Sequence, residues 1–153
     1  MKSLIFFVLS LIVLSFLYAD LHQAAQQVRR GKSANSWGMK GLFQRLYDIN
    51  TMEKVSGEVL RVETFVPLED MGPGVCLFVK AATDTAEVHL GPRWFIENQE
   101  IKFQATDQIA VCASKVTLNG RIVFVAATVE REDGILQLRD KNGIPVWVAW
   151  ESR

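Results

Sequence analysis

The sequence predicts a mainly β fold that closes into a small barrel, preceded by an apolar N-terminal helix. From position 54 onward, short runs alternate apolar and polar residues, as strands with one buried face do. Turn residues separate these runs, and Asn119-Gly120 is a strong signal for a two-residue hairpin. The first run changes its alternation at Val59–Leu60, close to Gly57, which indicates a β-bulge that lets one strand bend across two sheets.

The order of the predicted elements narrows the fold. Three strands, a short helix and two strands form the order of an OB-fold barrel. We expect a closing hairpin to follow, with Trp147 and Trp150 covering one face of the last barrel strand, which is apolar on both faces. In the short helix, Trp94 is expected to plug one barrel end and Arg93 to form an ion pair. The predicted strands span 54–66, 75–81, 85–90, 108–116 and 121–130, the short helix spans 93–97, and the C-terminal hairpin has arms 135–139 and 144–150.

The N-terminus predicts export. Met1-Lys2-Ser3 precedes sixteen uncharged residues, 4–19, which end in a small residue. This stretch is either a signal peptide cleaved after Ala19 or an uncleaved membrane anchor, since sixteen residues is marginal for spanning a bilayer. The remainder is then periplasmic, either soluble or tethered to the inner membrane. Residues 20–53 are interpreted as a helical extension and linker, and 54–153 as the barrel domain.

Composition restricts the function. Seventeen basic and seventeen acidic residues cancel, which argues against a nucleic-acid partner. Two cysteines are too few for a disulfide scaffold or a cysteine-based zinc site. We expect Cys76 and Cys112 not to be bonded to each other, because the first strand should lie between theirs. With no catalytic motif, the sequence predicts no enzyme, no cofactor and no metal.

One face of the second and third strands supplies the candidate binding residues. We expect a hairpin in which paired positions sum to 167, so that Phe78 opposes His89 and Lys80 opposes Glu87, all facing outward. OB-folds use exposed aromatic residues on these strands to stack flat ligands. The candidate ligand- or partner-binding residues are therefore Phe78, His89, Lys80 and Glu87. The alternative is that the N-terminal segment or the 67–74 loop covers Phe78 and that His89 is an ordinary surface or hydrogen-bonded residue.

Four motifs carry a resemblance to a known group. They are Tyr47-Asp48, Val-x-Gly-Glu-Val at 55–59, His-Leu-Gly-Pro-x-Trp at 89–94, and Leu-Arg-Asp-x-x-Gly-x-Pro-x-Trp at 138–147. Over about residues 47–150 the chain resembles small exported bacterial OB-fold-like proteins of unknown function. Its topology is also similar to the periplasmic bacterial OB-fold family. The resemblance implies an exported OB-like domain and supplies no substrate.

Together these observations favour a non-enzymatic, extracytoplasmic binding or interaction module. Its expected partner is an envelope or membrane protein, for which the chain would act as an accessory subunit. Residues 4–19 would contact the membrane if they stay uncleaved. The alternative function, by fold analogy alone, is binding of single-stranded nucleic acid or an oligosaccharide.

Overall fold

The computed structural model describes residues 37–151. The predicted signal or anchor helix, and the extension as far as residue 36, lie outside the described residues. Within residues 37–151, no helix is long and apolar enough to cross a membrane.

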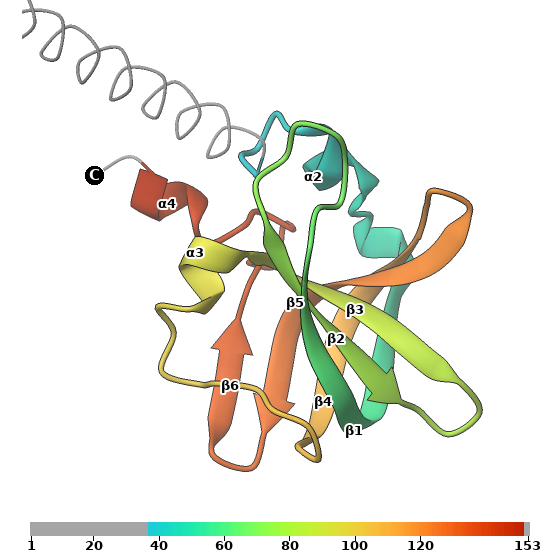
Figure 1. The fold of residues 1–153 in the computed structure, drawn as a ribbon. Helices are drawn as coiled ribbons and strands as arrows, with labels where there is room; N and C mark the ends of the chain where they lie inside the picture. The colour runs from blue at the N-terminus through green and yellow to red at the C-terminus, as the bar shows by residue number, and fades with distance from the viewer. Residues whose placement is uncertain (1–36, 152–153) are drawn as a thin grey trace, which may run out of the picture.

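Six strands form one sheet that closes into a ring (Figure 1). The sheet order is β3-β2-β1-β4-β5-β6, and β3 also pairs with β5. That closing contact is parallel and joins only Val88 to Phe124 and His89 to Val125, so the ring is not a regular barrel. The predicted order of strands and helix is confirmed. The strands are β1 (Met52–Phe65), β2 (Gly74–Lys80), β3 (Thr85–Pro92), β4 (Gln108–Leu118), β5 (Arg121–Arg131) and β6 (Gly134–Gln137); the helices are α2 (Leu42–Leu46), η1 (Ile49–Thr51), α3 (Arg93–Ile96) and α4 (Val148–Glu151).

The bend in β1 lies where the sequence predicts it. The β1–β2 register shifts between Val59 and Arg61, which is the expected bulge. Before the bulge β1 pairs mainly with β4, and beyond it with β2. Gly57 precedes the bend, and a Cβ built there would meet the carbonyl oxygen of Lys80 at 2.0 Å. The glycine of the 55–59 motif therefore allows the end of β2 to approach β1.

The β2–β3 hairpin has a different register from the predicted one. Paired positions sum to 165 over most of its length, so Phe78 opposes Glu87 and Lys80 opposes Thr85. The turn begins one residue earlier than expected, because the Ala81 amide donates to the Asp84 carbonyl and closes a four-residue loop. A shift of two positions leaves every side chain on its predicted side of the sheet but changes its partner. The β4–β5 turn at Asn119-Gly120 is confirmed, with Leu118 opposite Arg121.

The prediction that Trp94 plugs one end of the barrel is wrong. In α3, Phe95 and Ile96 are buried, whereas Trp94 is partly exposed, since neighbouring residues of a one-turn helix point in different directions. Phe95 rather than Trp94 packs on Trp147, with ring centroids 5.7 Å apart. The ion pair expected for Arg93 is confirmed, with Glu97 as its partner.

The predicted second arm of the C-terminal hairpin is also absent from the described residues. After β6, a single bridge joins Arg139 to Pro145, and the chain then turns into α4. Proline has no backbone N–H and cannot continue a ladder. Trp147 is buried, but it contacts Phe95 and the position of Gly91 rather than covering the exposed part of β5, and Trp150 is half exposed.

Candidate functional site

The four residues predicted as a binding site lie on one face but do not form an open aromatic spot. Phe78 is partly covered by the guanidinium of Arg61, which lies 3.6 Å from the ring centroid. His89 is only 1% exposed and lies opposite Cys76 instead of Phe78. The expected Lys80–Glu87 ion pair is wrong for the same reason, the two-residue difference in register.

His89 is enclosed between two phenylalanines. Its ring stacks on Phe43 with centroids 5.9 Å apart, and lies 4.1 Å from the ring centroid of Phe65. Its Nε2 is 2.8 Å from Glu87 Oε1, and the other oxygen of Glu87 lies 3.1 Å from Arg121. Burial lowers the pKa of His89, although the hydrogen bond and charge of Glu87 act in the opposite direction. The ring is therefore neutral near pH 7, and Nε2–H donates to Glu87.

Cys76 lies beside His89 but is not an activated nucleophile. Burial is the main cause that raises the pKa of its thiol to about 12, and the nearby carboxylates of Glu87 and Glu63 raise it further. A thiol with this pKa stays protonated at neutral pH, whereas the thiolate is the reactive form. A Cys–His nucleophilic pair is thus not what this face supplies.

A buried cation lies near the C-terminus. The Arg139 guanidinium lies between the rings of Tyr47 and Trp147, at 4.9 and 5.1 Å from their centroids. One of its nitrogens donates to the Ala126 carbonyl, whereas Nε and Nη2 have no hydrogen-bond partner among the described residues. Desolvation lowers the pKa of Arg139 to about 10, so the side chain is still charged at neutral pH.

Residues of three sequence motifs, 47–48, 89–94 and 138–147, pack against one another in this region. A Cβ at Gly91 would lie 2.7 Å from the Trp147 ring, and one at Gly143 would lie 2.6 Å from the Tyr47 ring. Trp37, from the segment predicted as a linker, is buried among them. Its indole donates to the Gly72 carbonyl, and its own carbonyl accepts from Trp147 Nε1 at 2.9 Å. These motifs are explained by packing, not by a reactive site.

The larger cavity is a cleft of about 680 Å³ between the β2–β3 hairpin and the strands β1, β4 and β5. Residues 81–86 of the hairpin form one wall, and residues 53–56 of β1 lie in the other. Lys115 at its edge is 3.3 Å from Glu53. Ile122 and Phe124 from β5 add apolar surface, and Ile122 is 59% exposed. The short β3–β5 contact leaves this end of the ring open, and Figure 1 shows the β2–β3 hairpin projecting away from the other strands.

The sequence signal for this cleft is the apolar pattern of β5. Strand 121–131 carries apolar residues on both faces, and we expected the C-terminal segment to cover the second face. Instead, Ile122 stays open to solvent at the cleft. An apolar strand face without a cover was therefore the available indication of a binding surface.

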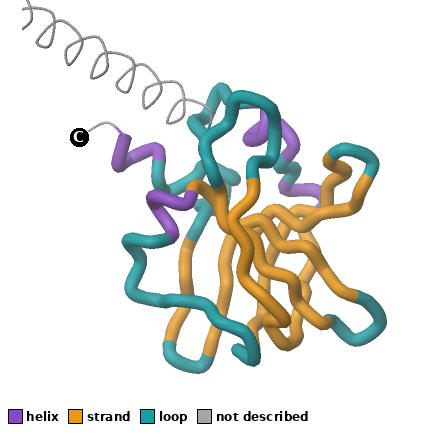
Figure 2. The backbone as a smooth tube through the Cα atoms, viewed as in Figure 1, coloured by secondary structure: helices purple, strands orange, loops and turns teal. Residues whose placement is uncertain are grey.

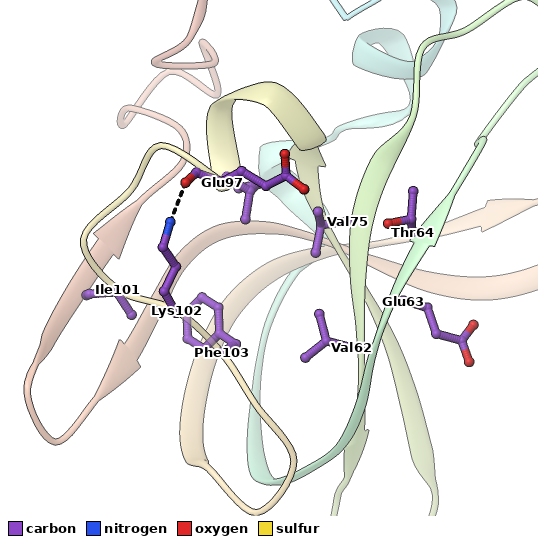
Figure 3. A pocket seen from close by; sticks show the side chains of 9 residues that line it. Val62, Glu63, Thr64, Val75, Glu97, Ile101, Lys102 and Phe103 are labelled. Atoms are coloured by element: carbon purple, nitrogen blue, oxygen red, sulfur yellow. Dashed lines mark hydrogen bonds between the residues drawn. The ribbon is translucent and has the colours of Figure 1, made fainter.

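A smaller cavity of about 300 Å³ lies between β1, β2, α3 and the chain that follows α3. Figure 3 shows Val62, Val75 and Phe103 directed into it, while the Glu63 carboxylate points away. Lys102 reaches the backbone carbonyl of Glu97 at the edge. The described residues contain no group of three potential metal ligands, here or elsewhere.

Comparison with known proteins assigns a family. The model of the MamS/MamX magnetosome protein family matches residues 51–136. The chain belongs to this family. No curated protein sequence matches it. The part that the MamS/MamX model matches contains all six strands, except for the last residue of β6, and every residue that lines either cavity. The buried residues Trp37, Arg139 and Trp147 lie outside the MamS/MamX match.

Proposed function

We propose that this MamS/MamX-family chain is a non-enzymatic, extracytoplasmic binding module with an OB-like domain. In this proposal it serves as an accessory subunit of an envelope or magnetosome membrane complex. Family membership and the export signal predicted from the sequence support this proposed location. The open cleft between the β2–β3 hairpin and β5 is the observation that carries the binding role.

The lining of the cleft favours a protein segment as its occupant. Its volume of about 680 Å³ lies within the range of ligand-binding sites, and its apolar lining residues are the alanines of the hairpin, Val55, Ile122 and Phe124. Charges of both signs stand at its edge, where Lys115 is paired with Glu53. A partner with an apolar side chain and a polar surround matches this pattern better than a polyanion does.

The distribution of titratable groups favours binding over catalysis. His89 is buried under Phe43 and Phe65, Cys76 is buried opposite it on β2, and neither residue lines the cleft. Catalysis by these groups would need a reactive protonation state and access to a substrate.

Photo-crosslinking from Ile122 tests the proposal. A photoreactive amino acid at position 122 in the full-length chain, in cells of the source organism, should give a discrete adduct with an envelope or magnetosome protein. Ile135 on β6 is a matched control, because it is 63% exposed and does not line the cleft. We expect no such adduct from position 135.

Substitutions at the same two positions give an independent readout. Ile122→Glu should release the chain from the complex that it cross-links to, since it places a charge at an apolar contact. Ile135→Glu should leave the chain in the complex. Equal adducts from both positions, or complete retention of Ile122→Glu, would exclude the cleft as the binding surface.

A further inference from the structure

One end of the domain carries exposed apolar side chains on several segments. Figures 1 and 2 show that α2, α4 and the β1–β2 loop gather where the described chain begins, with α3 just below α4. We name this surface the entry face. Its exposed apolar residues are between 36% and 66% accessible: Met39, Leu42, Val66, Trp94 and Trp150.

The two exposed tryptophans are fixed to the start of the described chain. Trp94 and Trp150 flank Phe95, with centroids 6.0 and 5.4 Å from its ring. Phe95 packs on Trp147, whose indole nitrogen donates to the carbonyl of Trp37. A contiguous set of aromatic contacts therefore joins the exposed rings to the residue at which the chain enters the domain.

We propose that the entry face rests on the surface of a lipid bilayer, with Trp94 and Trp150 at the level of the lipid headgroups. The inference extends the proposed function, and it rests on retention of the uncharged stretch 4–19 in the membrane. Seventeen residues, 20–36, then separate the membrane from Trp37. They span at most about 60 Å when extended and about 26 Å as a helix. The end at which they enter is the end that they hold closest to the bilayer.

The residue types on the entry face fit a lipid interface. Tryptophan is enriched at membrane surfaces, because its ring is apolar while its N–H can hydrogen-bond to water or headgroups. Charges near the exposed apolar residues have both signs: Lys40 and Arg93 are exposed, as are Glu69 and Asp70. Binding should therefore depend on apolar contact, and high salt should not abolish it, in contrast to attraction of a basic patch to anionic lipids.

Fluorescence quenching in vesicles tests the inference. The full-length chain is reconstituted in phosphatidylcholine vesicles whose upper acyl chains carry bromine, which quenches nearby tryptophan. Trp94 and Trp150 are two of the four tryptophans, and Trp37 and Trp147 are buried. We expect up to about half of the emission to be lost, at low and high salt alike. The remaining emission of the double variant Trp94→Gln/Trp150→Gln should not be quenched by the brominated lipid.

A tryptophan placed at the other end provides the control. Ile135→Trp, added to the double variant, puts an exposed ring on β6, and we expect its emission to be unaffected by brominated lipid. Unquenched wild-type emission would overturn the inference, as would equal quenching at position 135. If Trp94 and Trp150 become protected from solvent only after a protein is added, the inference is also overturned, in favour of a protein interface. Ile122→Glu should keep the quenching, so failure of the cleft proposal is separately visible.

Discussion

The environment of His89 couples its protonation to folding. The ring is neutral in the folded chain because burial between Phe43 and Phe65 disfavours the cation more than Glu87 favours it. Its pKa in the folded state therefore lies below the unfolded value of 6.5. When a pKa is lower in the folded state, the unfolded chain takes up the proton first as pH falls.

The lowered pKa of His89 predicts how the stability of the fold depends on pH. The contribution of His89 to stability should be constant above about pH 6.5 and should decrease as pH falls below that value. Melting temperatures measured between about pH 7.5 and pH 5.5 should fall for the wild type and change less for His89→Gln, since no residue then titrates at this position. His22→Gln, at the other histidine of the sequence, is the control and should keep the wild-type slope. A steeper slope in His89→Gln would contradict the neutral, buried ring.

Arg139 is a buried cation with unfilled hydrogen-bonding capacity. Within residues 37–151 its Nε and Nη2 have no hydrogen-bond partner, and its guanidinium lies over the rings of Tyr47 and Trp147. Arg139→Met keeps length and apolar contact and removes the charge, so we expect the free energy of unfolding to stay within about 1 kcal/mol. Arg139→Lys keeps the charge without the planar stack and should lose about 1–3 kcal/mol.

Denaturant unfolding of the two Arg139 variants measures these changes in the free energy of unfolding. Greater loss of stability in Arg139→Met than in Arg139→Lys would mean that Nε and Nη2 are satisfied by a bound water or anion. Equal, small losses would mean that the stacking on Tyr47 and Trp147 contributes little.

For single residues, the sequence predicts the side of the sheet on which a side chain lies better than it predicts which residues cover that side chain. The side of the sheet was predicted correctly for Phe78 and His89, because it depends only on alternation within a strand. What covers each residue was not predicted, because Arg61 and Phe43 come from other segments. Trp37 lies in a polar, glycine-rich stretch, and its burial depends on partners 35 and 110 residues away.

Among the elements, the β4–β5 turn gives the cleanest test. Asn119 and Gly120 have φ angles of 50° and 76°, as a type I′ turn requires. No atom of the described part of the chain lies within 4 Å of a Cβ built at Gly120, so the expected cost of a side chain there is conformational. Gly120→Val should reduce the free energy of unfolding by about 1–2 kcal/mol. Gly120→Asn should cost less, because asparagine tolerates a positive φ; equal thermal stability of both variants with the wild type would contradict the turn.

The β2–β3 hairpin and the predicted C-terminal hairpin show that local sequence signals do not determine every register. Asn119-Gly120 specifies its turn within two residues, and the predicted register is confirmed. The 81–84 loop has no comparable dipeptide, and the hydrogen bond from Ala81 to Asp84 selected a register two positions away. In the C-terminal segment, Pro145 and the Asp140 turn limited the pairing to one bridge, despite the apolar residues that follow.

For the whole molecule, the strand order was predictable but the openness of the ring was not. The element order and the bulge in β1 predict that β1 lies between β2 and β4, and this is confirmed. The β3–β5 contact joins distant strands through two residue pairs, and no local pattern reports its length. The cleft depends on where that contact stops, so it becomes visible only when the complete sheet is assembled.

The positions of the two cysteines test this assembled sheet. Cys76 on β2 pairs with Glu63, and Cys112 on β4 pairs with Lys54, so their partners lie nine residues apart along β1. Nine residues correspond to about 30 Å of strand, far beyond the roughly 7 Å between Cα atoms that a disulfide allows. In the folded protein near pH 7, a thiol reagent should label the exposed Cys112 and spare Cys76, which is buried and has its pKa raised to about 12. In denaturant without reductant, both should react, and prior reduction should add no further label. No labelling of an unreduced, denatured monomer would refute the strand order, and rapid labelling of Cys76 in the folded state would show that its face of the sheet is open.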